Sequence, residues 1–161
     1  MTRILYIVLI FAGFLEGNAR EQNKPMDDLR LKIAEVALSD TVAVEIGNPS
    51  QKPIRIWKDS NSWGAARWRL LRIRKGVLET FVQNPNSLFT RNVPSFDEIA
   101  GGSHIERKLN LNAQDWRPLG HKKTDFQSGD LVIVIYDVPV SREAREMNVW
   151  WGVAATSMTV Q

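Results

Sequence analysis

The chain of 161 residues contains no cysteine. This absence excludes disulfides, thiolate zinc sites, cysteine nucleophiles and a lipid-modified N-terminal cysteine. The sequence also lacks a glycosylation acceptor triplet, because proline occupies the middle of Asn48-Pro49-Ser50. A domain of roughly 150 residues can fold without disulfides, because its own core supplies the stability. This composition fits a bacterial periplasm or exterior better than a eukaryotic secretory route.

Residues with catalytic chemistry are scarce. The two histidines, His104 and His121, belong to no zinc-binding motif. The Gly-Gly-Ser-His run at residues 101–104 does not match the turn that carries a serine nucleophile. Asp97 and Glu98 are neighbours in sequence, whereas paired glycosidase carboxylates come from separate strands. We therefore predict a non-catalytic protein without metal or cofactor, and a hydrolase that uses only carboxylates is the third alternative.

The N-terminal segment has the layout of a secretory signal peptide. Arg3 precedes an apolar run over residues 4–15, and the small residues Gly17 and Ala19 stand where a signal peptidase recognises its substrate. The apolar run of about twelve residues is shorter than the roughly 20 that span a bilayer. We assign residues 1–19 to a signal peptide and residues 20–28 to a polar tether, with an uncleaved membrane anchor as the alternative. The mature protein is then exported, periplasmic or extracellular, with no membrane span.

The net charge of +3 is small. Residues 1–19 contain one arginine and one glutamate, so their removal leaves this charge unchanged. A surface with this small positive net charge tolerates anionic partners, but it is not the dense basic surface of a nucleic-acid binder. We expect no nucleic-acid partner and a monomer by default.

From residue 29 onward, apolar and polar residues mostly alternate, as in strands with one buried face. The alternating apolar positions are Leu29, Leu31 and Ile33; Val42, Val44 and Ile46; Ile54 and Ile56; Ala66, Trp68 and Leu70; and Ile105, Leu109 and Leu111. Lys75-Gly76 predicts a turn into a strand over residues 77–83, a further turn follows at residues 84–86, and residues 149–160 predict the last strand. Leu29 and Ile33 also fit helical spacing with Val36, which leaves a helix as the alternative there.

Four segments depart from simple alternation. The pattern slips between Leu70 and Leu71, which predicts a β-bulge. Residues 95–98 have capping-box spacing and predict a single helical turn, and residues 141–147 predict a short helix. The apolar run over residues 131–136 predicts a central strand covered on both faces.

These segments predict an all-β fold. About eight or nine short strands without a βαβ rhythm are typical of an antiparallel β-sandwich, here with at most one or two short helical turns. The sequence has no internal repeat or second-domain boundary, so residues 29–161 are predicted to form a single domain.

Two turn motifs carry a resemblance to a known group of domains. Residues 44–56, Val-Glu-Ile-Gly-Asn-Pro-Ser-Gln-Lys-Pro-Ile-Arg-Ile, resemble the strand–N-x-S-x-x-P-I–strand hairpin of bacterial immunoglobulin-like domains, among them the proteinase-inhibitor-like sandwich group. Residues 99–103, Ile-Ala-Gly-Gly-Ser, are similar to their I-x-P-G-x-S turn, with Ala100-Gly101 in place of Pro-Gly. The resemblance implies an immunoglobulin-like sandwich and an interaction or inhibitor-like module that uses its loops.

The chain has six tryptophans. Each buried indole removes ~150–250 Å² from water, so the core is the default position. Trp68 and Trp151 are in phase with apolar neighbours and are predicted in the core, and Trp116 is predicted to anchor a loop. The remaining three are out of phase or in a polar loop: Trp57, Trp150 and Trp63.

If Trp57, Trp63 and Trp150 converge on the surface, they form an aromatic platform that stacks on sugar rings. The polar residues beside such a platform are Arg55, Asp59 and Asn61. The alternative is that the polar loop folds over Trp57 and all three rings cover a sheet edge.

The same loop begins like a calcium-binding loop, since Asp59, Asn61 and Gly64 match its first, third and sixth positions. The position that needs a bidentate glutamate holds Leu70, so the match fails and no metal site is predicted.

An arginine-rich run predicts a basic strand face. The four residues assigned to it are Arg67, Arg69, Arg72 and Arg74. Most simply this face is solvated and pairs with acids such as Glu79. The alternative is an anion-binding face for acidic polysaccharide or an acidic protein.

Together these features predict an exported, non-catalytic binding module of the cell envelope that recognises carbohydrate through Trp57, Trp63 and Trp150. The alternative is a protein-interaction or proteinase-inhibitor-like module that uses its loops and the basic face. The partner is therefore either a carbohydrate or an envelope protein.

We expect cleavage after Ala19 because small residues occupy both recognition positions. Mass spectrometry of the protein recovered from an exporting host should give a chain that begins at Arg20. An intact Met1 terminus in the membrane fraction would contradict the assignment.

Overall fold

The computed structural model describes residues 29–37, 41–83, 93–111, 116–118 and 125–161. The predicted signal peptide, the polar tether and the turn at residues 84–86 lie outside these residues. In chain order the elements are β1 (Arg30–Val36), β2 (Thr41–Gly47), β3 (Ile54–Trp57), α2 (Ser62–Ala65), β4 (Trp68–Arg74), β5 (Val77–Gln83), β6 (Phe96–Ile99), β7 (His104–Asn110), β8 (Trp116–Pro118), β9 (Leu131–Val138), α3 (Arg142–Glu146) and β10 (Gly152–Thr159).

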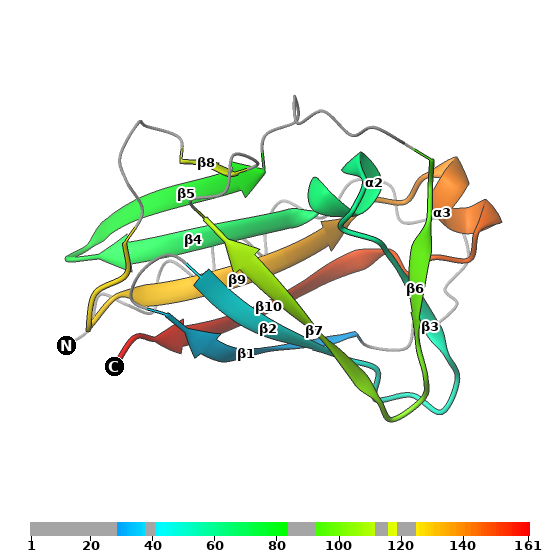
Figure 1. The fold of residues 1–161 in the computed structure, drawn as a ribbon, viewed down its shortest axis with the longest axis horizontal. Helices are drawn as coiled ribbons and strands as arrows, with labels where there is room; N and C mark the ends of the chain where they lie inside the picture. The colour runs from blue at the N-terminus through cyan, green and yellow to red at the C-terminus, as the bar shows by residue number, and fades with distance from the viewer. Residues whose placement is uncertain (1–28, 38–40, 84–92, 112–115, 119–124) are drawn as a thin grey trace, which may run out of the picture.

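The strands form three antiparallel sheets. One sheet has the order β1-β2-β7, a second has the order β10-β9-β4-β5-β8, and β3 pairs with β6 in a short ribbon. Figure 1 shows the three-stranded sheet lying over β9 and β10, with the ribbon at the end of the molecule that carries α3. Side chains from all three sheets share one apolar core. The predicted all-β, sandwich-like architecture is confirmed.

The first two strands follow the predicted alternation. Val42, Val44 and Ile46 of β2 have no exposed surface, and Ile33 of β1 packs with them. The register between β1 and β2 shifts between Ile33 and Glu35, after which Val36 lies opposite Val42. The strand prediction for this segment is therefore confirmed. The β-bulge explains the helical spacing, because the extra residue changes the phase of the strand.

Two local predictions are also confirmed. Ser141 caps α3, and its hydroxyl accepts a hydrogen bond from the Ala144 amide at 3.1 Å. Lys75 and Gly76 form the two-residue turn between β4 and β5 with positive φ values of 50° and 79°. Positive φ at both central residues gives a turn whose twist matches the strands, and glycine accepts it without strain.

The bulge predicted between Leu70 and Leu71 is wrong. β4 pairs with β5 and β9 along its length without a shift of register. Trp68, Leu70 and Arg72 therefore all point inward, and Leu71 points outward. An arginine is tolerated inside because Glu79 of β5 neutralises it and the Phe81 ring lies 5.5 Å from its guanidinium carbon.

The helical turn predicted at residues 95–98 is also wrong, because this segment forms β6. Its four residues pair with β3, from Trp57 opposite Phe96 to Ile54 opposite Ile99. The side-chain pair between Arg55 and Glu98 supports this ribbon. Pairing with a strand some 40 residues earlier in the chain outweighs the local capping signal.

The two turn motifs noted in the sequence contact one another. Asn48 is buried, and its side-chain amide donates to the carbonyls of Lys52 at 2.7 Å and Ile99 at 2.9 Å. The Gly102 amide donates to the Asn48 carbonyl at 2.9 Å. A side chain at Gly101 would place its Cβ 2.5 Å from the Gln51 carbonyl oxygen. These contacts explain why the corner requires asparagine and glycine.

Trp57 and Trp68 are each 1% exposed, so both lie in the core. The prediction that Trp57 points outward is wrong: Trp63 of α2 packs over it, with ring centroids 5.5 Å apart, and covers the side of β3 that the alternation leaves exposed.

We expect Trp57→Ala and Trp68→Ala each to cost about 3–5 kcal/mol of unfolding free energy, because both remove a fully buried indole. Denaturant midpoints measure these losses. Val93→Ala, at a position 68% exposed, is the control and should cost less than about 0.5 kcal/mol. If Trp57→Ala lowers the unfolding free energy as little as the control variant does, the burial of Trp57 is contradicted.

Candidate functional site

The tryptophans predicted to form a platform are instead packed into the molecule. Trp150 is 8% exposed, and its ring stacks on Tyr136 at 6.0 Å. Trp63 packs on Trp57, which confirms the alternative in which the polar loop folds over Trp57. Trp151 packs against the core but remains partly exposed. The rings of Trp57 and Trp150 therefore offer no free face on which a sugar ring stacks.

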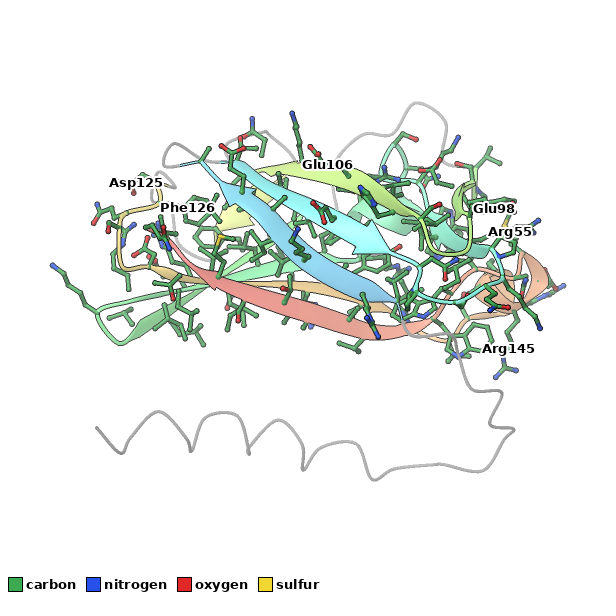
Figure 2. All side chains as sticks on the ribbon, turned by 90° about the horizontal axis from the view of Figure 1, so that it is seen from below. Arg55, Glu98, Glu106, Asp125, Phe126 and Arg145 are labelled. Carbon is green, nitrogen blue, oxygen red and sulfur yellow. The ribbon has the colours of Figure 1, made fainter. Side chains whose placement is uncertain are left out.

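The polar residues predicted beside the platform have structural partners. Asn61 caps α2, and its side-chain oxygen accepts from the amides of Trp63 and Gly64. Arg55 pairs with Glu98 at 3.2 Å, and its guanidinium lies 4.4 Å from the centre of the Phe96 ring. Figure 2 shows Arg55 and Glu98 together at one end of the molecule, opposite Asp125 and Phe126. Arg55 and Asn61 thus hold the ribbon and the loop in place.

Asp59 belongs to an ion network between the sheets. Arg107, an inward residue of β7, binds Asp59 at 2.9 Å and also contacts the carboxylate of Asp97. The Trp68 indole donates to the other oxygen of Asp59 at 3.0 Å. Burial raises the pKa of Asp59, while Trp68 and Arg107 oppose this rise. Both oxygens of Asp59 are bonded, so this network holds the loop against β4 and β7.

The predicted basic face is not formed, because its four arginines point in different directions. Arg72 and Arg74 point to the inner side of the sheet and Arg69 to the outer side. Each one has a partner: the Trp63 carbonyl for Arg67, Asp137 for Arg69, Glu79 for Arg72 and Asp130 for Arg74. Paired arginines distributed over both faces do not make an anion-binding surface.

The outer face of the β1-β2-β7 sheet is charged. Its outward charged side chains include Arg30, Lys32, Glu45, Glu106 and Lys108, and Thr41, Ala43, His104 and Asn110 occupy the same face. Lys32 pairs with Glu45 at 3.2 Å, and Glu106 lies on this side of the molecule in Figure 2. This is the usual pattern for an antiparallel sheet that has one face in water.

The outer face of the five-stranded sheet is different, because it is apolar. We call it the β9 face, and its large apolar side chains are Leu71, Ile73, Leu78, Val82, Leu131, Ile133, Ile135 and Val153. Ala155 and the polar residues Thr80, Ser157 and Thr159 occupy the same face. Leu78 is 57% exposed, Val153 is 65% exposed, and the others are partly exposed. Arg69, directly opposite Ile135, and Asp137 also belong to this face and pair at 3.1 Å, and Arg117 of β8 stands in register with Val82.

The sequence contained a signal for this face that the platform prediction missed. The run over residues 131–136 predicts a central strand, and β9 does lie between β10 and β4. Its inward residues, such as Val132 and Val134, are fully buried, but Ile133 and Ile135 remain partly exposed. Among the described residues, the expectation of cover on both faces is therefore correct for one face only.

No family model, curated protein or solved structure matches this chain. Within the described ranges no three histidine or acidic side chains lie close enough to hold a metal ion. No helix among the described residues has the length and apolarity to cross a membrane. Among the described residues, the exposed apolar side chains of the β9 face are the feature that most needs a functional explanation.

The Arg74–Asp130 pair gives a pH-dependent prediction. Asp130 is buried and accepts two bonds from Arg74, at 2.8 and 2.6 Å, which lower its pKa below the usual value of 3.8. Because the pKa of Asp130 is lower in the folded chain than in the unfolded chain, the pair stabilises the fold at pH values above the pKa of the unfolded state. This stabilisation is lost as the pH falls through the pKa of the folded state.

Asp130→Asn should therefore cost about 2 kcal/mol at pH 7, and this cost should shrink below about pH 4. Urea unfolding of both proteins from pH 7 to pH 3 measures the difference. Glu106→Gln, on the exposed sheet face, is the control and should show little difference at any pH. A cost for Asp130→Asn that stays constant down to pH 3 would contradict the assignment.

Proposed function

We propose that this chain is an exported, non-catalytic interaction module with an immunoglobulin-like fold, and that it binds a protein partner through the β9 face. The observation that carries the proposal is the contrast between the two outer faces: one is charged, and the other carries eight large apolar side chains on four adjacent strands.

The strand order supports the immunoglobulin-like part of the proposal. An immunoglobulin sandwich of the variable type has strands A, B, E and D in one sheet and strands G, F, C, C′ and C″ in the other. The orders β1-β2-β7 and β10-β9-β4-β5 match the A-B-E and G-F-C-C′ parts of these two sheets. In this correspondence β3 and β6 form an added ribbon, and the β9 face is the outer face of the G-F-C-C′ sheet.

The chemistry of the β9 face favours a protein over a carbohydrate. Protein interfaces have an apolar centre and a polar rim. Leu71, Ile133 and Ile135 supply such a centre, and Arg69 and Asp137 stand at its edge. A sugar site needs exposed ring faces, and Trp57 and Trp150 lie inside. Carbohydrate binding therefore has less support than protein binding.

One observation favours the inhibitor-like form of the module. The hairpin between β4 and β5 ends in the turn at Lys75-Gly76, and the next two residues, Val77 and Leu78, are 61% and 57% exposed. Figure 1 places this turn at the end of the molecule away from α3. An apolar hairpin tip of this kind suits insertion into a partner's cleft.

Photo-crosslinking in an exporting host tests the proposed face. Ser157 of β10 is exposed beside Ile133 on the β9 face, and Lys108 is exposed on the opposite sheet. We expect p-benzoylphenylalanine at Ser157 to give a protein adduct and the same residue at Lys108 to give none. Ile133→Lys should abolish the Ser157 adduct, because it places a charge in the apolar centre.

A thermal melt of Ile133→Lys establishes that the variant is folded. The absence of an adduct from Ser157, or equal adducts from Ser157 and Lys108, would refute the β9 face as the binding surface.

A further inference from the structure

We infer that a pocket on the outer face of the β1-β2-β7 sheet binds a phosphate group. The pocket has a volume of about 360 Å³, and its polar lining includes Arg30, Ser103 and His104. It belongs to the sheet that does not carry the β9 face. The inference is therefore independent of the protein-interaction proposal, and either one can fail without the other.

The floor of the pocket is Gly47 of β2. In the register of the sheet, Gly47 lies between Arg30 of β1 and His104 of β7. Directly opposed residues of neighbouring strands have their side chains on the same face. Arg30 and His104 therefore stand on either side of a position without a side chain. Because β1 and β7 are two strand spacings apart, about 9.6 Å, both side chains can donate to one group placed over Gly47.

The donors of the pocket are free of other described groups. The Arg30 guanidinium, the His104 imidazole and the Ser103 hydroxyl have no hydrogen bond or ion pair to another described residue. Arg30 differs in this from the four arginines of the predicted basic face, each of which has a partner. These three groups can consequently bind an anion without breaking a described contact.

The charges next to the pocket leave it positive. Two residues along the strands, Lys32 pairs with Glu45 at 3.2 Å, so their charges cancel. Glu106 lies opposite Glu45 on β7, and Lys108 pairs with it at 4.0 Å. The guanidinium of Arg30 is the cation that these pairs leave over, and it favours an anion in the pocket.

The directions of the donors favour phosphate over a carboxylate. Arg30 reaches the pocket from β1, His104 from β7 and Ser103 from the corner that precedes β7. A phosphate group has three strong acceptor oxygens around a tetrahedral centre, so it accepts from several sides. A carboxylate has two oxygens in one plane, and a single guanidinium satisfies both.

The corner that carries Ser103 is fixed by backbone hydrogen bonds. The Ser103 amide donates to the Ala100 carbonyl at 3.1 Å, and the Asn48 amide donates to the Ser103 carbonyl at 2.9 Å. Figure 1 shows the loops after β2 and before β7 lying together at this end of the sheet. Donors held in place before a ligand arrives lose less freedom on binding.

Titration of the chain recovered from an exporting host with inorganic phosphate tests the site. In ¹H–¹⁵N NMR spectra the amide signals of Gly47 and His104 should move, with a dissociation constant of about 1–10 mM, as expected for an exposed and screened site. Sodium acetate at the same ionic strength is the comparison and should bind at least tenfold more weakly.

Three variants examine the donors and the floor. Arg30→Gln and His104→Gln should each raise the dissociation constant at least about fivefold, because each removes a charge-assisted hydrogen bond. Gly47→Val should abolish binding, because its side chain fills the floor. The strand accommodates this change, since a Cβ at Gly47 would lie 3.8 Å from the Arg30 carbonyl oxygen, an ordinary contact distance.

Lys108→Gln is the matched control, because it removes one positive charge from the same face outside the pocket. It should leave the dissociation constant within about twofold. Thermal melts establish that all four variants are folded.

Vesicles of phosphatidylcholine with and without phosphatidic acid identify the source of the phosphate. Binding to phosphatidic acid that Gly47→Val removes supports a lipid headgroup as the ligand. Binding of inorganic phosphate without binding to these vesicles supports a small phosphorylated compound.

Three results would overturn the site. The first is the absence of shifts at Gly47 and His104 up to about 100 mM phosphate. The second is acetate binding as tight as phosphate binding. The third is an equal loss in Lys108→Gln and Arg30→Gln, because this would show a general effect of charge on the sheet face.

Discussion

The Tyr136 ring joins the parts of the core. It has no exposed surface, and it lies between Trp68 of β4 at 4.6 Å and Trp150, just before β10, at 6.0 Å. The Tyr136 hydroxyl and the Trp150 indole nitrogen are buried without a hydrogen bond of normal geometry in the described structure. Burial raises the pKa of Tyr136 well above its usual range, and the charge of Asp59 adds to this effect, so the hydroxyl stays neutral. Each ring gains about 4–6 kcal/mol gross from burial, which exceeds the penalty of about 1–3 kcal/mol for each unbonded group.

Those parts of the fold that depend on local chemistry could be predicted from the sequence. The alternation in β2, the Ser141 cap of α3 and the Lys75-Gly76 turn all act within a few residues, and the structure contains each of them. Trp57, Arg72 and the β6 strand could not be predicted in this way. Their positions depend on α2, on Glu79 and Phe81, and on pairing with β3, which come from other parts of the chain.

The candidate site was only partly visible in the sequence for a related reason. An apolar run such as residues 131–136 reports that its side chains avoid water, but it does not report which molecule covers them. Within this chain Val132 and Val134 are covered by the opposite sheet. Among the described residues Ile133 and Ile135 have no such cover and stay partly exposed, and the apolar run alone does not distinguish the two outcomes.

The inward Arg107 has a consequence for how copies of this molecule meet. Among the described strands β7 is at the edge of its sheet, and a sheet edge is a template for a further strand from another chain. A charge that points inward from the middle of the edge strand, held by Asp59 and Asp97, makes a flat continuation of the sheet unfavourable. On the outer side Glu106 and Lys108 add charges of their own to the same strand. Growth of the sheet into fibres is thereby opposed on this side.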